Sequence, residues 1–256
     1  MDYLLPELNL LQIKSSVSKE KNTGEFVIEP LSPGYGVTIG NSLRRVLLAS
    51  LEGSAVKSVK IEGVDHEFST LKGMKEDVVE FILNLKVARF KLNSDEPSRI
   101  SLSVKGPAVV TTSDFKETSE IDVVSKDHYL CTIEKGGKLD LEITVDKGRG
   151  YLPVEKRLEE KLPIGTILVD SLYTPVKKVK FDVENSRVGS ITNYNKLSIE
   201  VTTDGSVSPE ESMAYASRIL VEHFQAIADA NTVETKKTKK ETKPAQKKVA
   251  KNAKKK

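Results

Sequence analysis

Three glycines at the start of an apolar stretch form the first arrangement in this sequence that could do chemistry. Gly34, Gly36 and Gly40 follow a proline-rich turn and precede apolar residues that recur every three to four positions, as in a helix. Glycines at a helix entrance let backbone N–H groups approach a phosphate, as in dinucleotide-binding turns. Here the turn follows a hairpin broken by proline, and no crossover to a parallel strand is evident. We interpret the glycines as serving a tight turn and close helix packing, with a dinucleotide-binding turn as the alternative.

Other residues with catalytic or metal-binding chemistry are scattered along the sequence. His66, His128 and His223 are widely separated, and Cys131 is the only thiol. His128 and Cys131 could approach each other, but two ligands do not make a zinc site. We therefore expect hydrogen-bonded structural histidines, no metal and no cofactor. The single cysteine excludes an internal disulfide and fits a reducing cytoplasm.

Recognisable catalytic motifs are missing from the sequence. It contains no Walker-type phosphate loop, no GxSxG motif and no close-spaced cluster of three Asp. Paired acids such as Glu159-Glu160 and Glu210-Glu211 are interpreted as solvated or capping charges. We therefore predict that the chain has no catalytic residues of its own.

Positive charge is concentrated at the end of the chain. Residues 236–256 hold eleven Lys and one Glu, a charge of +10. Because the whole chain carries +3, residues 1–235 carry −7, which argues against a basic nucleic-acid-binding face on the folded part. Such a tail cannot bury a core and is expected to be disordered. It could contact nucleic-acid phosphates without sequence readout, or it could only increase solubility; both interpretations stay open.

Membrane insertion and secretion are not expected from this sequence. No apolar run approaches ~18 residues, and the first residues lack a basic segment followed by a hydrophobic one. We therefore expect a cytoplasmic protein without a membrane partner.

The elements around the glycine turn predict a hairpin followed by a helix. Residues 8–18 and 24–30 have strand character on either side of a plausible hairpin connection. The helix is expected to end near Gly53, which would suit a C-terminal cap. On a helical wheel its apolar residues cover roughly 200°, whereas a one-sided surface helix needs little more than ~100°. Arg44 falls inside the apolar arc, and Arg45 projects from the polar side.

Two later helices and several strands complete the predicted α+β chain. Residues 75–90 predict a second helix with two apolar faces, and residues 99–203 predict mostly half-buried strands. Ser208 and the residues after it have the capping pattern of a last helix, expected to end near Ala230. This helix also has a narrow polar arc. All three helices thus carry more apolar surface than one core requires, which predicts an assembly element.

Four blocks of the chain, in order, resemble the bacterial RNA polymerase alpha-subunit family. They are residues 31–48, residues 63–86, residues 148–153 and residues 163–176. The first block, Leu-Ser-Pro-Gly-Tyr-Gly-Val-Thr-Ile-Gly-Asn-Ser-Leu-Arg-Arg-Val-Leu-Leu, matches the family's signature helix. The resemblance covers roughly residues 7–231.

The resemblance implies an α+β amino-terminal region with a discontinuous α/β dimerisation subdomain and an inserted, mostly β subdomain. The expected boundaries are 1–53 with 178–233 for the first, 54–177 for the second, and 234–256 for the disordered tail. It also implies a non-catalytic subunit of a nucleotidyltransferase. Its homodimer would scaffold the beta and beta-prime subunits, with omega and sigma joining the holoenzyme at the nucleoid.

The resemblance also implies contact residues. Arg45 and Leu48 would face beta, while Lys86 and Val169 would face beta-prime. Two helices would form the dimer seam. The expected seam residues are Ile39, Leu43, Arg44, Leu47, Leu220, Phe224 and Ile227.

One departure from the family pattern concerns the end of the chain. Family members usually continue through a linker into a small helical domain that contacts promoter DNA, and nothing of that kind follows Glu234. We hypothesise that the Lys-rich tail is a non-specific substitute. Two other classes remain as alternatives: a small-molecule enzyme that uses the Gly34 turn for a nucleotide, and a nucleic-acid-binding protein that acts through its tail.

Overall fold

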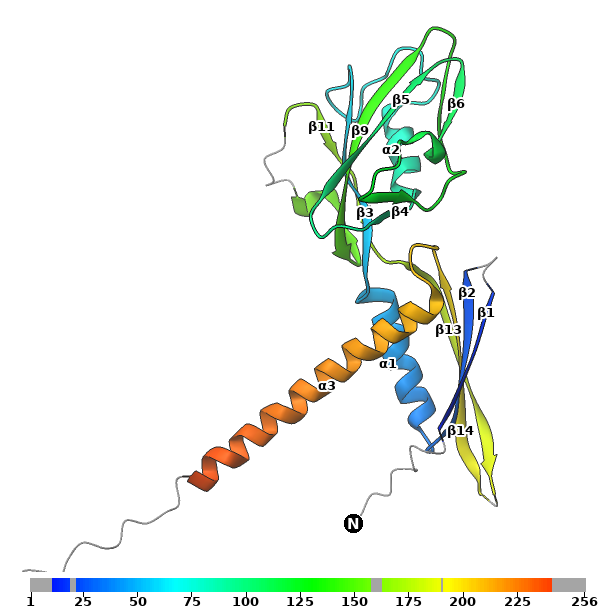
Figure 1. Ribbon diagram of the computed structural model, residues 1–256, viewed down its shortest axis with the longest axis vertical. Coiled ribbons are helices and arrows are strands. Elements are labelled where there is room, and N and C mark those ends of the chain that lie inside the picture. Colours follow the sequence, from blue (N-terminus) through cyan, green and yellow to red (C-terminus); the bar gives the residue numbers. More distant parts are fainter. Residues whose placement is uncertain (1–10, 19–21, 158–162, 190, 241–256) are drawn as a thin grey trace, which may run out of the picture. The chain divides into compact units, whose positions relative to one another are not determined.

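The protein has a mixed α and β fold in open antiparallel sheets, which confirms the predicted α+β class (Figure 1). The computed structural model describes residues 11–18, 22–157, 163–189 and 191–240. The chain divides into two compact units, Met1–Ser217 and Arg218–Lys256. All the sheets lie in the first unit.

Segments from the two ends of the first unit build a four-stranded sheet. Its order is β1 (Gln12–Ser18), β2 (Thr23–Leu31), β14 (Ile191–Thr203) and β13 (Val176–Val188). Neighbouring strands are antiparallel throughout, and β1 with β2 forms the predicted hairpin. Helix α1 (Tyr35–Ala49) packs against β13 and β14.

The buried side of α1 is made by small residues alternating with leucines. Gly36, Gly40, Leu43 and Leu47 are its buried residues, and their spacing of four and three places them on one face. A Cβ on Gly40 would lie 2.7 Å from the ring of Phe181. These glycines therefore let the helix approach the sheet closely, as predicted.

The second sheet belongs to the segment inserted between α1 and β13. Its order is β11 (Thr166–Leu168), β3 (Glu52–Ile61), β9 (Lys138–Arg149) and β5 (Ser98–Lys105). Helix α2 (Val78–Val87) begins at Asp77, whose side chain accepts a hydrogen bond from the Glu80 N–H. Short two-stranded pairings and single turns fill the rest. They are β4 (Phe90–Leu92) with β7 (Ile121–Val123), β6 (Ala108–Thr111) with β8 (Tyr129–Ile133), β10 (Tyr151–Leu152) with β12 (Ser171–Leu172), and the 3-10 turns η3 (Thr112–Asp114) and η4 (Val154–Arg157).

One continuous hydrophobic core fills the inserted segment. It gathers buried residues from Val56 to Val169. Phe81 of α2 is fully buried in it, and the rings of Phe90 and Phe115 meet edge to face with centroids 5.5 Å apart. Alternation along β9 directs every second side chain into this core.

The chain passes between the two sheets at two adjacent places. It enters the inserted segment at Gly53 and leaves it at Tyr173, and a Cβ on Gly53 would lie 1.9 Å from the Tyr173 carbonyl oxygen. Gly53 was predicted to cap α1, but the helix ends at Ala49 with Ser50 as its C-cap, and Gly53 lies in β3. Because Gly53 has no side chain, the segments that enter and leave the inserted part can lie in contact with each other.

Helix α3 (Pro209–Lys240) starts with the predicted capping pattern. The Ser208 hydroxyl accepts from the Glu211 N–H at 3.2 Å, and the Glu211 carboxylate accepts from the Ser208 N–H at 3.2 Å. The helix continues ten residues beyond the predicted end at Ala230. Lys and Glu are good helix formers, so the start of the segment expected to be disordered can remain helical without a core. Residues 241–256 of the predicted tail lie outside the described residues.

Candidate functional site

The Gly34 turn is already occupied by a side chain of the same chain. Asn195 of β14 accepts hydrogen bonds from the N–H groups of Gly34, at 2.8 Å, and Gly36, at 3.3 Å. Gly34 has φ of 86°, a left-handed conformation that favours glycine. The amides that would cradle a phosphate are therefore used to join α1 to β14, which argues against the dinucleotide alternative.

Two of the three histidines and the cysteine serve as local structural groups. His128 Nε2 lies 2.8 Å from the Asn84 carbonyl oxygen, and His223 Nδ1 lies 2.7 Å from that of Ile219. Burial, helped by the charge of Glu76, raises the pKa of the Cys131 thiol to about 12. Within the described ranges, no group of three or more His, Cys, Asp or Glu could hold a metal ion.

None of the described helices is long and apolar enough to cross a bilayer.

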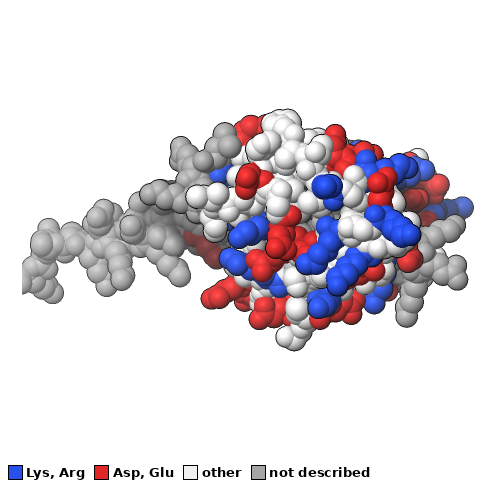
Figure 2. Space-filling view, turned by 90° about the horizontal axis from the view of Figure 1, so that it is seen from above, with Lys and Arg blue, Asp and Glu red and all other residues white. Residues whose placement is uncertain are grey.

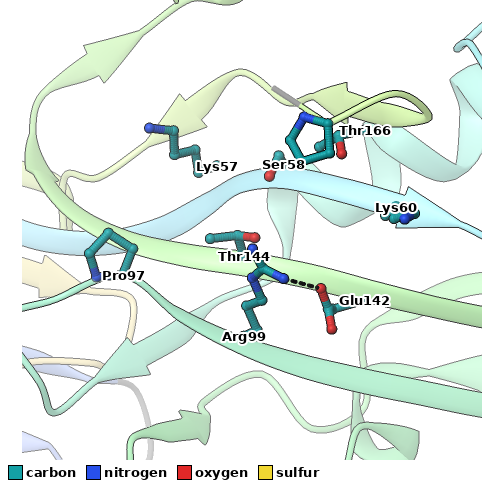
Figure 3. A pocket seen from close by; sticks show the side chains of 9 residues that line it. Lys57, Ser58, Lys60, Pro97, Arg99, Glu142, Thr144 and Thr166 are labelled. Carbon is teal, nitrogen blue, oxygen red and sulfur yellow. Dashed lines mark hydrogen bonds and ion pairs between the residues drawn. The ribbon is translucent and has the colours of Figure 1, made fainter. Parts of the chain in front are cut away.

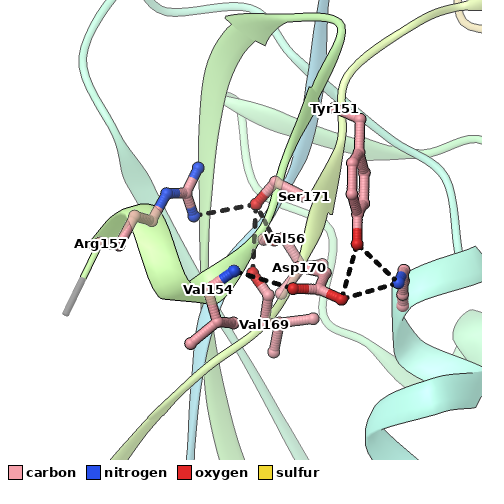
Figure 4. Close-up of polar contacts among 8 residues, drawn as sticks. Val56, Tyr151, Val154, Arg157, Val169, Asp170 and Ser171 are labelled. Atoms are coloured by element: carbon pink, nitrogen blue, oxygen red, sulfur yellow. Dashed lines mark hydrogen bonds and ion pairs between the residues drawn. The ribbon is translucent and has the colours of Figure 1, made fainter.

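A polar cluster at the surface of the inserted segment brings together Lys86, Tyr151 and Asp170; Figure 4 labels Tyr151 and Asp170. Lys86 Nζ donates to Asp170 Oδ2 at 2.8 Å and lies 3.3 Å from the Tyr151 hydroxyl. That hydroxyl donates to Asp170 Oδ2 at 2.9 Å. Lys86 Nζ also lies 5.1 Å from the centroid of the Tyr151 ring. We call these three residues the Lys86 cluster.

Three separate elements position the Lys86 cluster. Lys86 lies in the last turn of α2, where the helix dipole favours a cation, Tyr151 lies in β10, and Asp170 lies just before β12. The Val154 N–H donates to Asp170 Oδ1 at 2.9 Å, so both carboxylate oxygens are held. Beside Asp170, the Ser171 hydroxyl donates to the Val56 carbonyl at 2.8 Å and anchors this loop to β3.

The electrostatics of the cluster keep both charges in place. The hydrogen bond to Asp170 raises the pKa of Lys86, against the effect of partial burial. Partial burial acts to raise the pKa of Asp170, but the hydrogen bonds from its neighbours, above all Lys86, outweigh burial and lower it. The ammonium and carboxylate therefore stay charged at neutral pH while about a third of each side chain remains exposed.

Val169, predicted beside Lys86 as a contact residue, is not at the surface. It is 1 % exposed and belongs to the core of the inserted segment. Adjacent residues of an extended segment point to opposite sides, so Asp170 takes the outward position instead. Tyr151, half exposed, is a member of the site that sequence reasoning missed. Its only signal was its place in the third resembling block.

The signature helix presents a different surface from the one its wheel predicted. Leu43 and Leu47 lie in the chain's own core, so they offer no surface to a second copy. Arg44 was expected within the apolar arc but is exposed, as is Arg45. Ile39, like Leu48, is partly buried. The error arose because Gly36 and Gly40, which the wheel does not count as apolar, define the buried face.

The second unit carries the remaining residues of the predicted seam, on α3. Leu220, Phe224 and Ile227 recur at helical spacing and share one face. Leu220 is partly exposed, while Phe224 is 63 % and Ile227 60 % exposed within this chain. An aromatic and aliphatic stripe of this kind on a single helix is typical of an interaction surface.

A hollow of about 230 Å³ lies on the open face of the inserted sheet (Figure 3). Lys57, Lys60 and Arg99 line it, but the Arg99 guanidinium pairs with Glu142 at 3.1 Å. Figure 2 shows acidic and basic side chains interspersed over the face seen from above. On that face, the described residues form no single-sign surface for a nucleic acid.

Comparison with known proteins identifies the family. Residues 59–174 match the model of the RNA polymerase Rpb3/RpoA insert domain. The chain is 48 % identical over 208 residues to a DNA-directed RNA polymerase subunit alpha of Clostridium botulinum (strain Eklund 17B / Type B), covering 81 % of this chain and 66 % of the relative. It is 52 % identical over 202 residues to that of Moorella thermoacetica, covering 79 % and 64 %. The chain thus spans just under two thirds of the length of these relatives. It belongs to the family of bacterial DNA-directed RNA polymerase alpha subunits.

Proposed function

We propose that this chain is a non-catalytic alpha subunit that scaffolds a DNA-dependent RNA polymerase. The family match carries the proposal, since relatives named DNA-directed RNA polymerase subunit alpha share about half of their aligned residues with it. The described residues add exposed helix faces and one ordered surface cluster, but no metal-holding group.

The proposed architecture has two working parts. A dimerisation subdomain uses residues 1–53 and 178–233, and an inserted subdomain uses residues 54–177. The four-stranded sheet with α1 supports the first, and the continuous core of the inserted segment supports the second. The proposed tail covers residues 234–256.

The homodimer seam is proposed to involve the exposed stripe of α3. Phe224 and Ile227 supply large apolar side chains that a second copy would cover. Ile39 and Arg44 remain proposed members on α1. Leu43 and Leu47 would support the seam from the chain's own core without contacting the partner.

Docking of the catalytic subunits is proposed at two surfaces. Arg45 and Leu48 on α1 would face beta, and Lys86 would face beta-prime. Because Val169 is buried, the rest of the second surface consists of Tyr151 and Asp170, with the exposed Leu83 and Val87 of α2 beside Lys86. Omega and sigma would join the complete enzyme, in the cytoplasm at the nucleoid, with DNA contact through the Lys-rich tail as an open part of the proposal.

Reconstitution of the purified chain with the beta and beta-prime subunits tests the proposal. We expect a dimer by sedimentation velocity, and a complex that gains template-dependent RNA synthesis when all subunits are mixed. A stable monomer that fails to bind beta would contradict it. Deleting residues 236–256 tests the tail separately: unchanged promoter-complex affinity and salt dependence would remove DNA contact from the proposal.

A further inference from the structure

A buried ion pair joins the inserted segment to the turn that precedes α3. Arg89 Nε lies 3.4 Å from Asp204 Oδ2, and their side chains are only 10 % and 5 % exposed. Arg89 follows α2 by two residues, whereas Asp204 directly follows β14 of the four-stranded sheet. The other described ion pairs have at least one partner more than a quarter exposed. The Arg89–Asp204 pair therefore differs from the others in that both side chains are almost fully buried.

Both partners of the pair are held by further hydrogen bonds. Arg89 Nη1 donates to the Leu172 carbonyl at 3.0 Å, in the segment that returns to the first sheet. The Arg89 carbonyl accepts from the Val124 N–H at 3.0 Å. The Asp204 N–H donates to the Pro175 carbonyl at 2.9 Å, and its carboxylate accepts from the Ser206 N–H at 2.9 Å. The pair thus ties together both sheets and the return crossing.

The pair lies beside the return crossing of the chain. In the described part of the chain, the backbone passes between the two sheets at the adjacent crossings near Gly53 and Tyr173. The Arg89–Asp204 contact adds another point, and Gly205 packs beside Val124 there, with its Cβ position 3.3 Å from Val124 Cγ1. Because the pair is bonded to Leu172 and Pro175, on either side of Tyr173, it adds a buried contact beside the return crossing that restricts rotation of the inserted segment there.

We infer that Arg89 and Asp204 are positioning residues that fix the orientation of the inserted segment, and with it the Lys86 cluster, relative to the four-stranded sheet. This inference rests on the proposed scaffold function for its consequence, because a scaffold must present its docking surfaces at one angle. Buried ion pairs often add little net stability but can favour one arrangement over others. Lys86 lies in the last turn of α2, three residues before Arg89, so a change at the pair acts on the end of α2.

Loss of the pair reduces docking without removing any docking residue. If the correct orientation falls to about a tenth of the population, the apparent affinity for the partner weakens about tenfold. Arg89→Met and Arg89→Lys form a matched pair of variants, since both side chains are long but only lysine restores a cation opposite Asp204. Arg99→Met is the control, because it removes an exposed ion pair on the same inserted segment.

Distances between two spin labels measure the orientation in the full-length chain. Exposed Glu134 in the inserted segment and Asn185 in β13 are replaced by labelled cysteines, while native Cys131 is buried and resists labelling. Labelled chain is diluted with unlabelled chain so that dimers carry one labelled copy. Arg89→Met is expected to broaden the distance distribution and weaken beta-prime docking about tenfold, Arg89→Lys to recover most of both, and Arg99→Met to change neither.

Two results would overturn the inference. One is an unchanged narrow distribution in folded Arg89→Met, and the other is equal behaviour of the Met and Lys variants. The labelled chain that keeps Arg89 and Asp204 gives a test that needs no change at the pair. It should show one narrow distance distribution, and a broad distribution there would contradict the inference. The spin-label results stand even if the chain fails to bind beta-prime, so the proposed function and the inference can fail separately.

Discussion

The inserted segment and the part built from the two ends of the chain bury their apolar residues differently. The inserted segment packs helix α2 and several antiparallel strand pairs around one core that runs from Val56 to Val169. Helix α1 packs on the four-stranded sheet through a face half made of glycine. In the second unit, α3 exposes Phe224 and Ile227. The first arrangement is complete within one chain, whereas the second is consistent with burial against another copy.

A substitution in the core of the inserted segment tests whether that core is complete within one chain. It should give the largest loss of stability. Phe81→Ala removes a fully buried ring and is expected to cost about 3–5 kcal/mol of unfolding free energy, because a cavity adds to the lost burial. Denaturant unfolding followed by circular dichroism measures the change. Self-association should remain at protein concentrations where the variant is folded, and a monomeric folded variant would break the comparison.

Changing the stripe on α3 should have the opposite outcome. Phe224→Ser removes an exposed aromatic side chain, so we expect little loss of monomer stability but a dimer weakened by about 2 kcal/mol or more. Sedimentation equilibrium over a range of concentrations measures the dissociation constant. Glu222→Ser, on the other side of the same helix, is the matched control. Equal dissociation constants for the two variants would place the seam elsewhere.

A substitution in the Lys86 cluster tests whether the inserted segment, whose core is complete within one chain, also carries a docking surface. Lys86→Met keeps the length of the side chain but removes the charge that Asp170 and Tyr151 hold. Loss of a partly exposed charged contact is expected to weaken beta-prime docking by about 1 kcal/mol. Titration of labelled beta-prime against the dimer gives the affinity. Lys138→Met, which removes another surface ammonium paired with an Asp, is the control and should bind normally.

Acid should remove a smaller part of the same interaction. The pKa of Asp170 is lowered in the folded chain, so its stabilising contact with Lys86 is complete above the ordinary carboxyl value of about 4 and is lost as pH falls through the lowered pKa. The difference in stability between the wild type and Asp170→Asn should be constant from pH 5 to 8, about 1 kcal/mol or less. It should close below pH 4. A difference that grows in acid would contradict the sign of the shift.

Sequence reasoning succeeded where a short pattern decides the structure. The capping pattern at Ser208, the hairpin before α1 and the alternation along β9 all formed as predicted, since each depends on local hydrogen bonds or on side-chain period. Sequence reasoning failed where a contact between residues far apart in the sequence decides the structure. No local pattern indicates that Asn195 fills the Gly34 turn, that Gly53 faces Tyr173, or that Val169 is internal while Asp170 is partly exposed.

The candidate site could likewise be predicted only in part. The resemblance supplied Lys86 and the surrounding block, but the partner of Lys86 depends on three segments that meet only in the folded chain. A helical wheel placed Arg44 by the apolarity of its neighbours. The packing face is set instead by the absence of side chains at Gly36 and Gly40, a criterion that hydropathy does not measure.

The contact between Gly53 and Tyr173 has a consequence for how this protein can be divided. Because the inserted segment starts and ends at the same point, its removal leaves two ends close enough to be joined by a short turn. Residues 54–172 hold a continuous core, so they should fold as an independent domain when expressed alone. An inserted domain of this kind can be exchanged, shortened or lost while the surrounding sheet keeps its chain path.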